Sequence, residues 1–136
     1  MILRIIAAFV TSAGFGYIFK APKRDIYLYG LVGAIGFWVL ELSHNAFLAT
    51  VVIAMLSLYF AKKRKNIATV YLVTGIIPYV PGAGIYNTMY YLVFGMREES
   101  LEAGLSTLMT VGSIALGFVF VFSINKALKE TLLRLN

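Results

Sequence analysis

The sequence contains no cysteine, and histidine occurs only once, as His44. Without cysteine the chain can form neither a disulfide nor a thiolate metal site. A single histidine also excludes a multi-histidine metal centre within one chain. We recognise no nucleophile–base pair, no paired carboxylates and no phosphate-binding loop. We therefore expect a protein that is not an enzyme and that holds neither a metal nor a cofactor.

Charged residues are also scarce, at 13% of the chain, whereas hydrophobic residues make up 60% of its 136 residues. A soluble domain of this length could not bury so many apolar side chains, so the composition indicates an integral membrane protein in contact with lipid. The net charge of +6 does not indicate nucleic-acid binding. Its lysines and arginines cluster between apolar segments, which is where membrane proteins carry topology signals.

The apolar segments predict an all-α, polytopic membrane protein with about five transmembrane helices, the fourth broken at a Pro-x-x-Pro-Gly motif. Residues 1–136 form a single transmembrane domain in this prediction. The remaining charged segments, including an acidic stretch from Arg97 to Glu102, are expected as loops. The predicted spans are residues 2–19, 26–42, 46–61, 67–95 (broken at 78–84) and 103–124.

The distribution of basic residues predicts the orientation in the cell membrane. All lysines and arginines except Arg4 and Arg97 lie in segments 20–25 and 62–65 or in the tail after residue 125. Five single passes place those three regions on one side of the membrane. The positive-inside rule then predicts the N-terminus outside and the C-terminus inside. A re-entrant hairpin at the fourth span is disfavoured, because it would send the basic tail outside.

The break in the fourth span carries the strongest functional signal. Pro78 and Pro81 have no N–H group to donate, and Gly82 and Gly84 add backbone freedom. Unpaired backbone survives at membrane depth only against protein or a water-filled cavity. Many transporters hold substrates at such broken helices. A kink that serves packing alone is the competing interpretation.

Polar groups near the break suggest a class of substrate. The N-terminus of the second half-helix presents free N–H groups, which suit a carboxylate, and carbonyls freed by the prolines suit an ammonium group. Hydroxyl groups, including that of Tyr79, and one side-chain amide lie in the same apolar setting. A site with both ends would suit an amino acid or another small carboxylate. The predicted substrate pathway comprises Thr74, Pro78, Pro81, Gly82, Tyr86 and Asn87.

Glu41 is the acidic residue nearest to the interior of a span. A carboxylate there could carry a proton for coupled transport, or it could simply mark the membrane boundary. His44 would share its helix face if the helix continued, and the two would then form a pH-sensitive contact. A lone histidine at a loop is more often simply solvated, so Glu41 alone is the candidate for proton coupling.

The segment Gly75–Tyr86, followed by Met89, resembles the signature of the threonine/serine exporter (ThrE) family. The family pattern reads roughly I-P-L-V-P-G-x-x-I-Y, and this chain has Tyr79 where leucine is usual. Similar residues at Phe15-Gly16 and before the basic cluster 62–65 extend the resemblance over essentially the whole chain. It matches the C-terminal membrane half of the family, which also occurs as a separate small protein.

The resemblance implies export of threonine and serine, driven by proton motive force. Split versions of the family pair this small protein with a larger subunit similar to the N-terminal half, and succinate is implied as a further substrate. We therefore interpret the chain as the small subunit of a two-component exporter for threonine, serine or a related small carboxylate. Its partner would be that larger subunit, or further copies of itself.

Two other interpretations remain. The chain could be a structural or assembly subunit that stabilises a partner without contacting substrate. The small-residue pairs Ser12/Gly16 and Ser113/Gly117, each four positions apart, fit such a role because they allow close helix contact. An ion channel is less favoured, since neither a filter sequence nor a ring-forming charge is evident.

Overall fold

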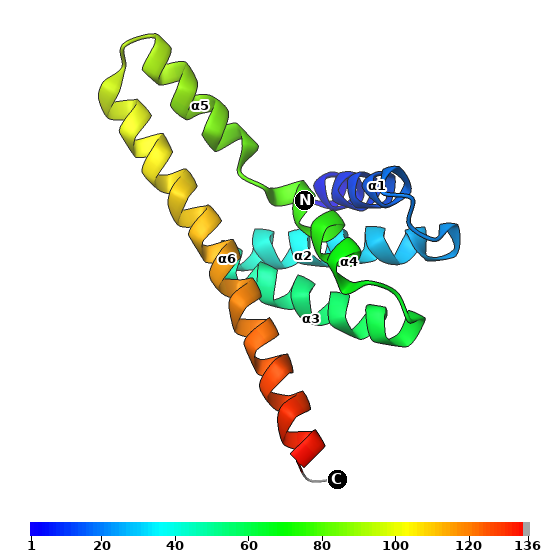
Figure 1. The fold of residues 1–136 in the computed structure, drawn as a ribbon. Coiled ribbons are helices and arrows are strands. Elements are labelled where there is room, and N and C mark those ends of the chain that lie inside the picture. The colour runs from blue at the N-terminus through cyan, green and yellow to red at the C-terminus, as the bar shows by residue number, and fades with distance from the viewer. Residues whose placement is uncertain (135–136) are drawn as a thin grey trace.

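The computed structural model describes residues 1–134, and throughout that range the chain is helical apart from short connections (Figure 1). No strand occurs in these residues, so the all-α prediction is confirmed. In chain order the elements are α1 (Ile2–Ile18), the 3₁₀ turn η1 (Lys23–Asp25), α2 (Ile26–Ser43), α3 (Ala46–Arg64), α4 (Ala68–Ile76), the 3₁₀ turn η2 (Ile77–Tyr79), α5 (Gly82–Val93) and α6 (Arg97–Arg134).

Three helical stretches of the described chain are long and apolar enough to cross a membrane, namely Lys23–Ser43, Ala46–Arg64 and Arg97–Thr131. A fourth span exists if α4 and α5, which are bent by 49° at the break, count as one crossing. Helix α1 is apolar but has only 17 residues, slightly fewer than the roughly 20 that a straight span needs. The structure thus supports three to four candidate spans, and the count of five stays a prediction.

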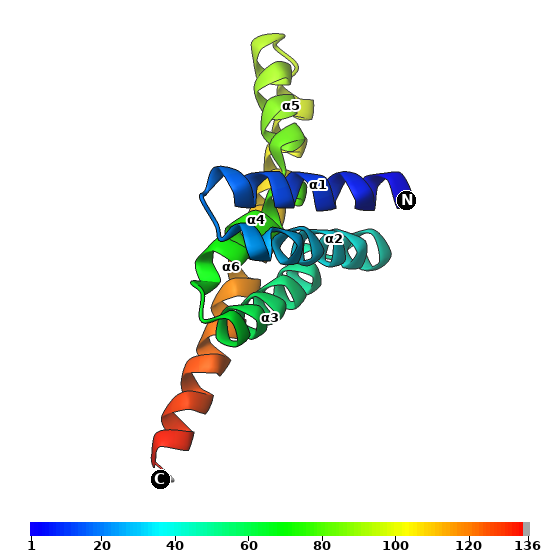
Figure 2. The same ribbon diagram turned by 90° about the vertical axis from the view of Figure 1, so that its right-hand side faces the viewer.

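The helices form two parts, shown in Figures 1 and 2. Helices α1, α2, α3 and α4 pack together into a body, and the long helix α6 packs on this body through α3. Helix α5 packs mainly on α6, with which it forms a hairpin that projects from the body. The core of the body includes a stacked pair, Tyr29 of α2 and Tyr71 of α4, whose ring centroids lie 4.1 Å apart.

Small residues set the distance between α1 and α2. A methyl group at Gly33 would overlap the hydroxyl of Ser12, so the two helices approach as closely as they do only because residue 33 has no side chain. On the next turn of α2, a methyl group at Gly36 would overlap Ile53 of α3. Close contact at small residues is the usual way in which membrane helices gain packing energy without a hydrophobic driving force.

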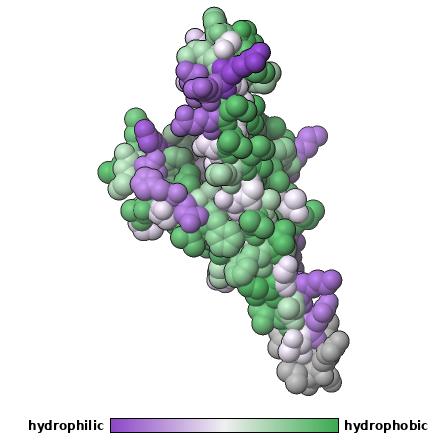
Figure 3. Space-filling view, turned by 90° about the vertical axis from the view of Figure 1, so that its left-hand side faces the viewer, coloured by the Kyte–Doolittle hydropathy of each residue, from purple (hydrophilic) through white to green (hydrophobic). Residues whose placement is uncertain are grey.

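The acidic segment that we expected as a loop is helical instead. Arg97 begins α6, and Glu98 and Glu99 lie in its first turn, where negative charge is favourable next to the exposed N–H groups. Helix α6 then continues without a break to Arg134. Figure 3 shows hydrophilic residues gathered at the tip of the α5–α6 hairpin and towards the C-terminal end of α6, with an apolar surface between them.

Candidate functional site

The break between α4 and α5 has a defined backbone geometry. After the 3₁₀ turn η2, the N–H of Gly82 donates to the carbonyl of Val80 at 2.7 Å, and Pro81 between them has φ −74° and ψ 54°. This is an inverse γ-turn, whose central residue requires the φ that proline already has. The N–H of Val80 still donates to the carbonyl of Ile76 at 3.1 Å, as in an α-helix, and the γ-turn at Pro81 follows. Helix α5 then leaves in a new direction, bent by 49°.

A buried hydrogen bond fixes the break to α3. The hydroxyls of Tyr79 and Thr50 lie 2.7 Å apart, and both side chains are buried. Thr50 uses its single proton to donate to the carbonyl of Ala46 at 2.7 Å. The hydroxyl of Tyr79 must therefore donate to Thr50. Tyrosine at this position, which departs from the leucine of the family pattern, thus ties the break to the body.

The residues of the predicted pathway do not converge on one cavity. Thr74 is fully buried within the body and donates to the backbone carbonyl of Val70 at 2.8 Å. Tyr86 and Asn87 lie on the exposed surface of α5, and Tyr86 is 67% exposed. Gly82 faces open space. The hydroxyl of Thr74 and the polar groups of α5 therefore belong to separate surroundings within this chain.

Pro78 and Glu41 are connected through Arg4. Pro78 lines a cavity of about 320 Å³ between α1, α2 and the break, together with Arg4 and Thr11. Arg4 also forms an ion pair with Glu41, with Nη1 and Oε1 3.0 Å apart, although the arginine side chain is 70% exposed. Glu41, the candidate for proton coupling, therefore contacts Arg4, and Arg4 lines the same cavity as Pro78.

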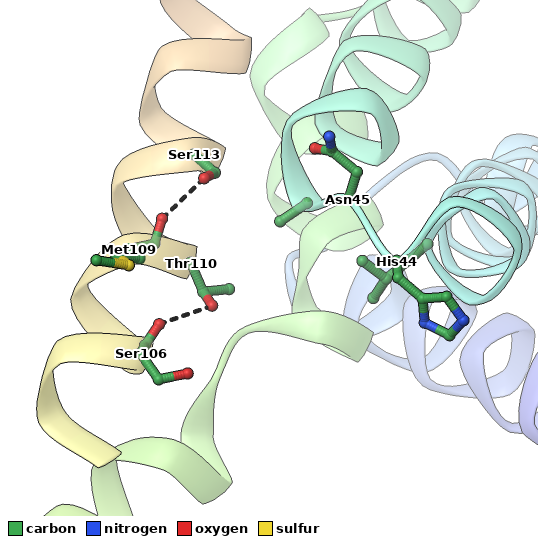
Figure 4. A pocket seen from close by; sticks show the side chains of 8 residues that line it. His44, Asn45, Ser106, Met109, Thr110 and Ser113 are labelled. Atoms are coloured by element: carbon green, nitrogen blue, oxygen red, sulfur yellow. Dashed lines mark hydrogen bonds between the residues drawn. The ribbon is translucent and has the colours of Figure 1, made fainter. Parts of the chain in front are cut away.

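A partly polar hollow lies elsewhere, between the α2–α3 turn and the middle of α6 (Figure 4). This open cavity has a volume of about 530 Å³. Ser106, Thr110 and Ser113 project from α6 towards this turn. Thr110 and Ser113 donate to carbonyls four residues earlier, at 3.0 and 2.8 Å, so each oxygen retains acceptor capacity. The sequence analysis did not assign these hydroxyls to a site.

The α2–α3 turn contributes two side chains with different roles. Asn45 caps α3, because its Oδ1 accepts from the N–H of Phe47 at 2.9 Å. His44 ends α2 in the left-handed conformation, with φ 50°, so the helix does not continue through it. Its ring points away from α6 in Figure 4. The cavity wall therefore combines hydroxyls and an amide with the apolar side chains of Leu40, Ala46 and Met109, and His44 lies at its edge.

A buried carboxylate, which the sequence analysis treated only as part of a loop, lies at the opposite end of the body. Asp25 is 4% exposed and forms an ion pair with Arg64, with Oδ1 and Nε 3.4 Å apart. Asn66 donates to the other carboxylate oxygen at 3.1 Å. Arg64 also donates to the hydroxyl of Tyr27 at 2.8 Å. These contacts join the start of α2 to the end of α3.

Metal chemistry has no visible support in the part of the chain that the structure describes. No group of three histidine, cysteine, aspartate or glutamate side chains lies together there. Hydroxyls, an amide and helix carbonyls line the polar cavity, and such groups hold small polar solutes by hydrogen bonds.

A family model described as the threonine/serine exporter, ThrE, matches residues 4–124 of the chain. This range includes every helix except the first two residues of α1 and the C-terminal part of α6. No solved structure matches the chain.

Proposed function

The chain belongs to the threonine/serine exporter family, and from this we propose that it is the small membrane subunit of a two-component exporter. The substrate would be threonine, serine or a related small carboxylate such as succinate. The partner would be a larger subunit similar to the N-terminal half of the family, with further copies of this chain as the other arrangement. Members of this family are transporters, which fits a membrane transport protein that is not an enzyme.

One observation carries the proposal, namely the polar cavity beside α6. Its volume of about 530 Å³ lies within the range of about 300–1,000 Å³ that is typical of small-molecule sites. Thr110 and Ser113 offer acceptor oxygens on one side, and Asn45 offers an amide on the other. A hydroxylated amino acid needs such hydrogen-bonding groups when it leaves water, because an unpaired polar group is costly in an apolar setting.

The break between α4 and α5 is the second part of the proposed transport pathway. In our proposal Pro78, Pro81 and Gly82 set the backbone direction of α5, while Thr74 holds the end of α4 in place. Tyr86 and Asn87 are exposed here, and they would line the pathway where α5 meets the larger subunit. The N-terminal turn of α5 would then present its N–H groups to a carboxylate.

Glu41 would carry the coupled proton. Its position near the end of α2 and its ion pair with Arg4 place a carboxylate beside the cavity at Pro78. Protonation of Glu41 would release Arg4 and change the charge at this cavity. The positive-inside rule supports an orientation in the cell membrane with the N-terminus out and the C-terminus in. Glu41 would then face the side from which protons enter.

The test is efflux of labelled threonine, serine and succinate from preloaded cells that express the chain together with a larger subunit of the family. Thr110→Val removes one hydroxyl from the cavity and keeps the side-chain shape. Thr131→Val is the matched control, because Thr131 donates to the carbonyl of Ala127 at 2.9 Å in the same manner but lies outside the cavity. We expect efflux to fall about tenfold in Thr110→Val and to be unchanged in Thr131→Val.

Assembly must be measured in the same cells, by co-purification of the two subunits. Loss of efflux with an intact complex supports the pathway at the cavity. Equal efflux in Thr110→Val and Thr131→Val refutes it. Pro81→Ala and Asn87→Ala test the break in the same way, and they separate its contribution from that of the cavity.

A structural or assembly subunit is the second candidate, and the hairpin favours it. Helix α5 has no buried residue, and its main contact is α6. A partner could therefore cover most of the surface of α5. If substitutions on α5 reduce the yield of the complex and leave efflux per complex unchanged, the chain is a scaffold.

A further inference from the structure

Two cavities join end to end where α3 crosses α6. The first encloses about 480 Å³, and its wall includes Lys62, Asn66 and Lys129. The second encloses about 250 Å³, and its wall is almost entirely apolar, with Met55 and Ile124 on opposite sides. Leu58, Asn125 and Leu128 line both cavities, so the two form one continuous groove. The groove is basic at one end and apolar along the rest.

The charge at the basic end is not compensated by the described side chains. Lys126 forms an ion pair with Glu130 at 3.9 Å, and Arg64 forms one with Asp25. Lys62 and Lys129 form no ion pair with any side chain up to residue 131. Asn66 at this end donates to Asp25, which Arg64 already neutralises, and Glu130, next to Lys129 in the chain, pairs with Lys126. The groove therefore presents two cations to an anion.

We propose that this groove binds one anionic phospholipid. The phosphate would lie between Lys62 and Lys129, with the amide of Asn125 donating to it, and one acyl chain would follow the apolar part past Met55 and Ile124. Basic pockets between membrane helices are a known way to hold anionic head groups. A free phosphate would use only the basic end, whereas a phospholipid uses both parts. The proposal does not depend on the transported solute.

The lysines are tested with the purified full-length protein in detergent, by native mass spectrometry and lipid titration. The probes are phosphatidylglycerol and, as a neutral lipid, phosphatidylcholine. Lys62→Gln with Lys129→Gln removes the proposed phosphate ligands. Lys63→Gln with Lys126→Gln removes the same charge from the same two helices outside the groove, since Lys63 lies over the ring of Tyr59.

We expect retention of phosphatidylglycerol to weaken by about fivefold for each groove lysine and by roughly thirtyfold for the pair. The control pair should change it by less than about threefold. Equal losses in the two double variants would mean that the surface charge as a whole attracts the lipid, and this would overturn the site. Equal retention of phosphatidylcholine and phosphatidylglycerol by the unmodified protein would overturn it as well.

Two further experiments distinguish a bound lipid from a bound free anion. Ile124→Trp fills the apolar part of the groove, and Leu116→Trp, at an exposed position of the same helix, is its control. We expect only Ile124→Trp to weaken lipid retention. Inorganic phosphate should fail to displace the lipid at millimolar concentration. If phosphate displaces it and Ile124→Trp has no effect, the site binds a soluble anion, and the phospholipid assignment is wrong.

Discussion

The hydrogen bond between Tyr79 and Thr50 leads to an asymmetric prediction. Tyr79 donates to Thr50, which in turn donates to the carbonyl of Ala46. Tyr79→Phe removes the donor and leaves Thr50 with its other bond, so the loss is that of an ordinary hydrogen bond. Interhelical bonds of this kind in membrane proteins average about 0.6 kcal/mol, and values near 1 kcal/mol are common in soluble proteins.

Thr50→Val should cost more, although it changes the shape of the side chain very little. The valine cannot accept a hydrogen bond, so the hydroxyl of Tyr79 becomes a buried donor without a partner. Tyr79 is only 7% exposed, so water does not readily replace the lost acceptor. An orphaned buried group costs about 1–3 kcal/mol. The double variant should cost less than the sum of the two single ones, because it removes donor and acceptor together.

The assay is equilibrium unfolding of the purified protein in mixed micelles, run as a double-mutant cycle. We expect Thr50→Val to destabilise the protein most. Tyr79→Phe and the double variant should each destabilise it less than Thr50→Val does. A destabilisation by Tyr79→Phe that equals or exceeds that of Thr50→Val would refute the assigned direction of the bond. Additive effects would show that the two hydroxyls do not interact.

Three further predictions concern other parts of the molecule. Gly33→Ala should destabilise the protein by about 1–3 kcal/mol, because the added methyl overlaps Ser12; Gly14→Ala, at a position with open space, should be neutral or stabilising in the same unfolding assay. Asp25→Ala should lower the free energy of unfolding by about 2 kcal/mol. This is less than the loss of about 3–5 kcal/mol for a fully buried ion pair, because the arginine partner is 26% exposed. A measured change below about 0.5 kcal/mol would contradict this. Glu41→Gln should make efflux insensitive to an imposed proton gradient; efflux that still follows the gradient would exclude Glu41 as the coupling group.

Local chemistry explains what the sequence predicted well. The prolines at 78 and 81 cannot continue a helix, and α4 ends at Ile76 while α5 begins at Gly82. That the two helices form one broken membrane span stays a prediction. Helix α3 begins at Ala46, where the predicted span begins, and the side chain of Asn45 directly before it caps the helix. Such features depend on neighbours within a few positions along the chain, and these can be read directly from the sequence.

The features that sequence reasoning missed depend on distant neighbours. The polar cavity brings Asn45 together with Ser113, and nothing in either local segment indicates the other. Likewise, a carboxylate in a basic loop resembles any solvated charge, and only the fold places Asp25 beside Arg64. The charges of residues 97–102 predicted a loop. This prediction was wrong because glutamates in the first turn of a helix stabilise it.

Helix α6 also fixes how deeply the protein lies in the bilayer. With 38 residues and a rise of about 1.5 Å per residue, it is about 57 Å long, almost twice the roughly 30 Å of hydrocarbon. The stretch between Glu102 and Lys126, which carries no charge, measures about 36 Å on the same basis. A shift of α6 along its axis by two turns in either direction would move the charge of Glu102 or of Lys126 into the hydrocarbon. The charges at both ends of the uncharged stretch thus resist movement of α6 along its axis, and the cavity beside Thr110 keeps its depth in the membrane.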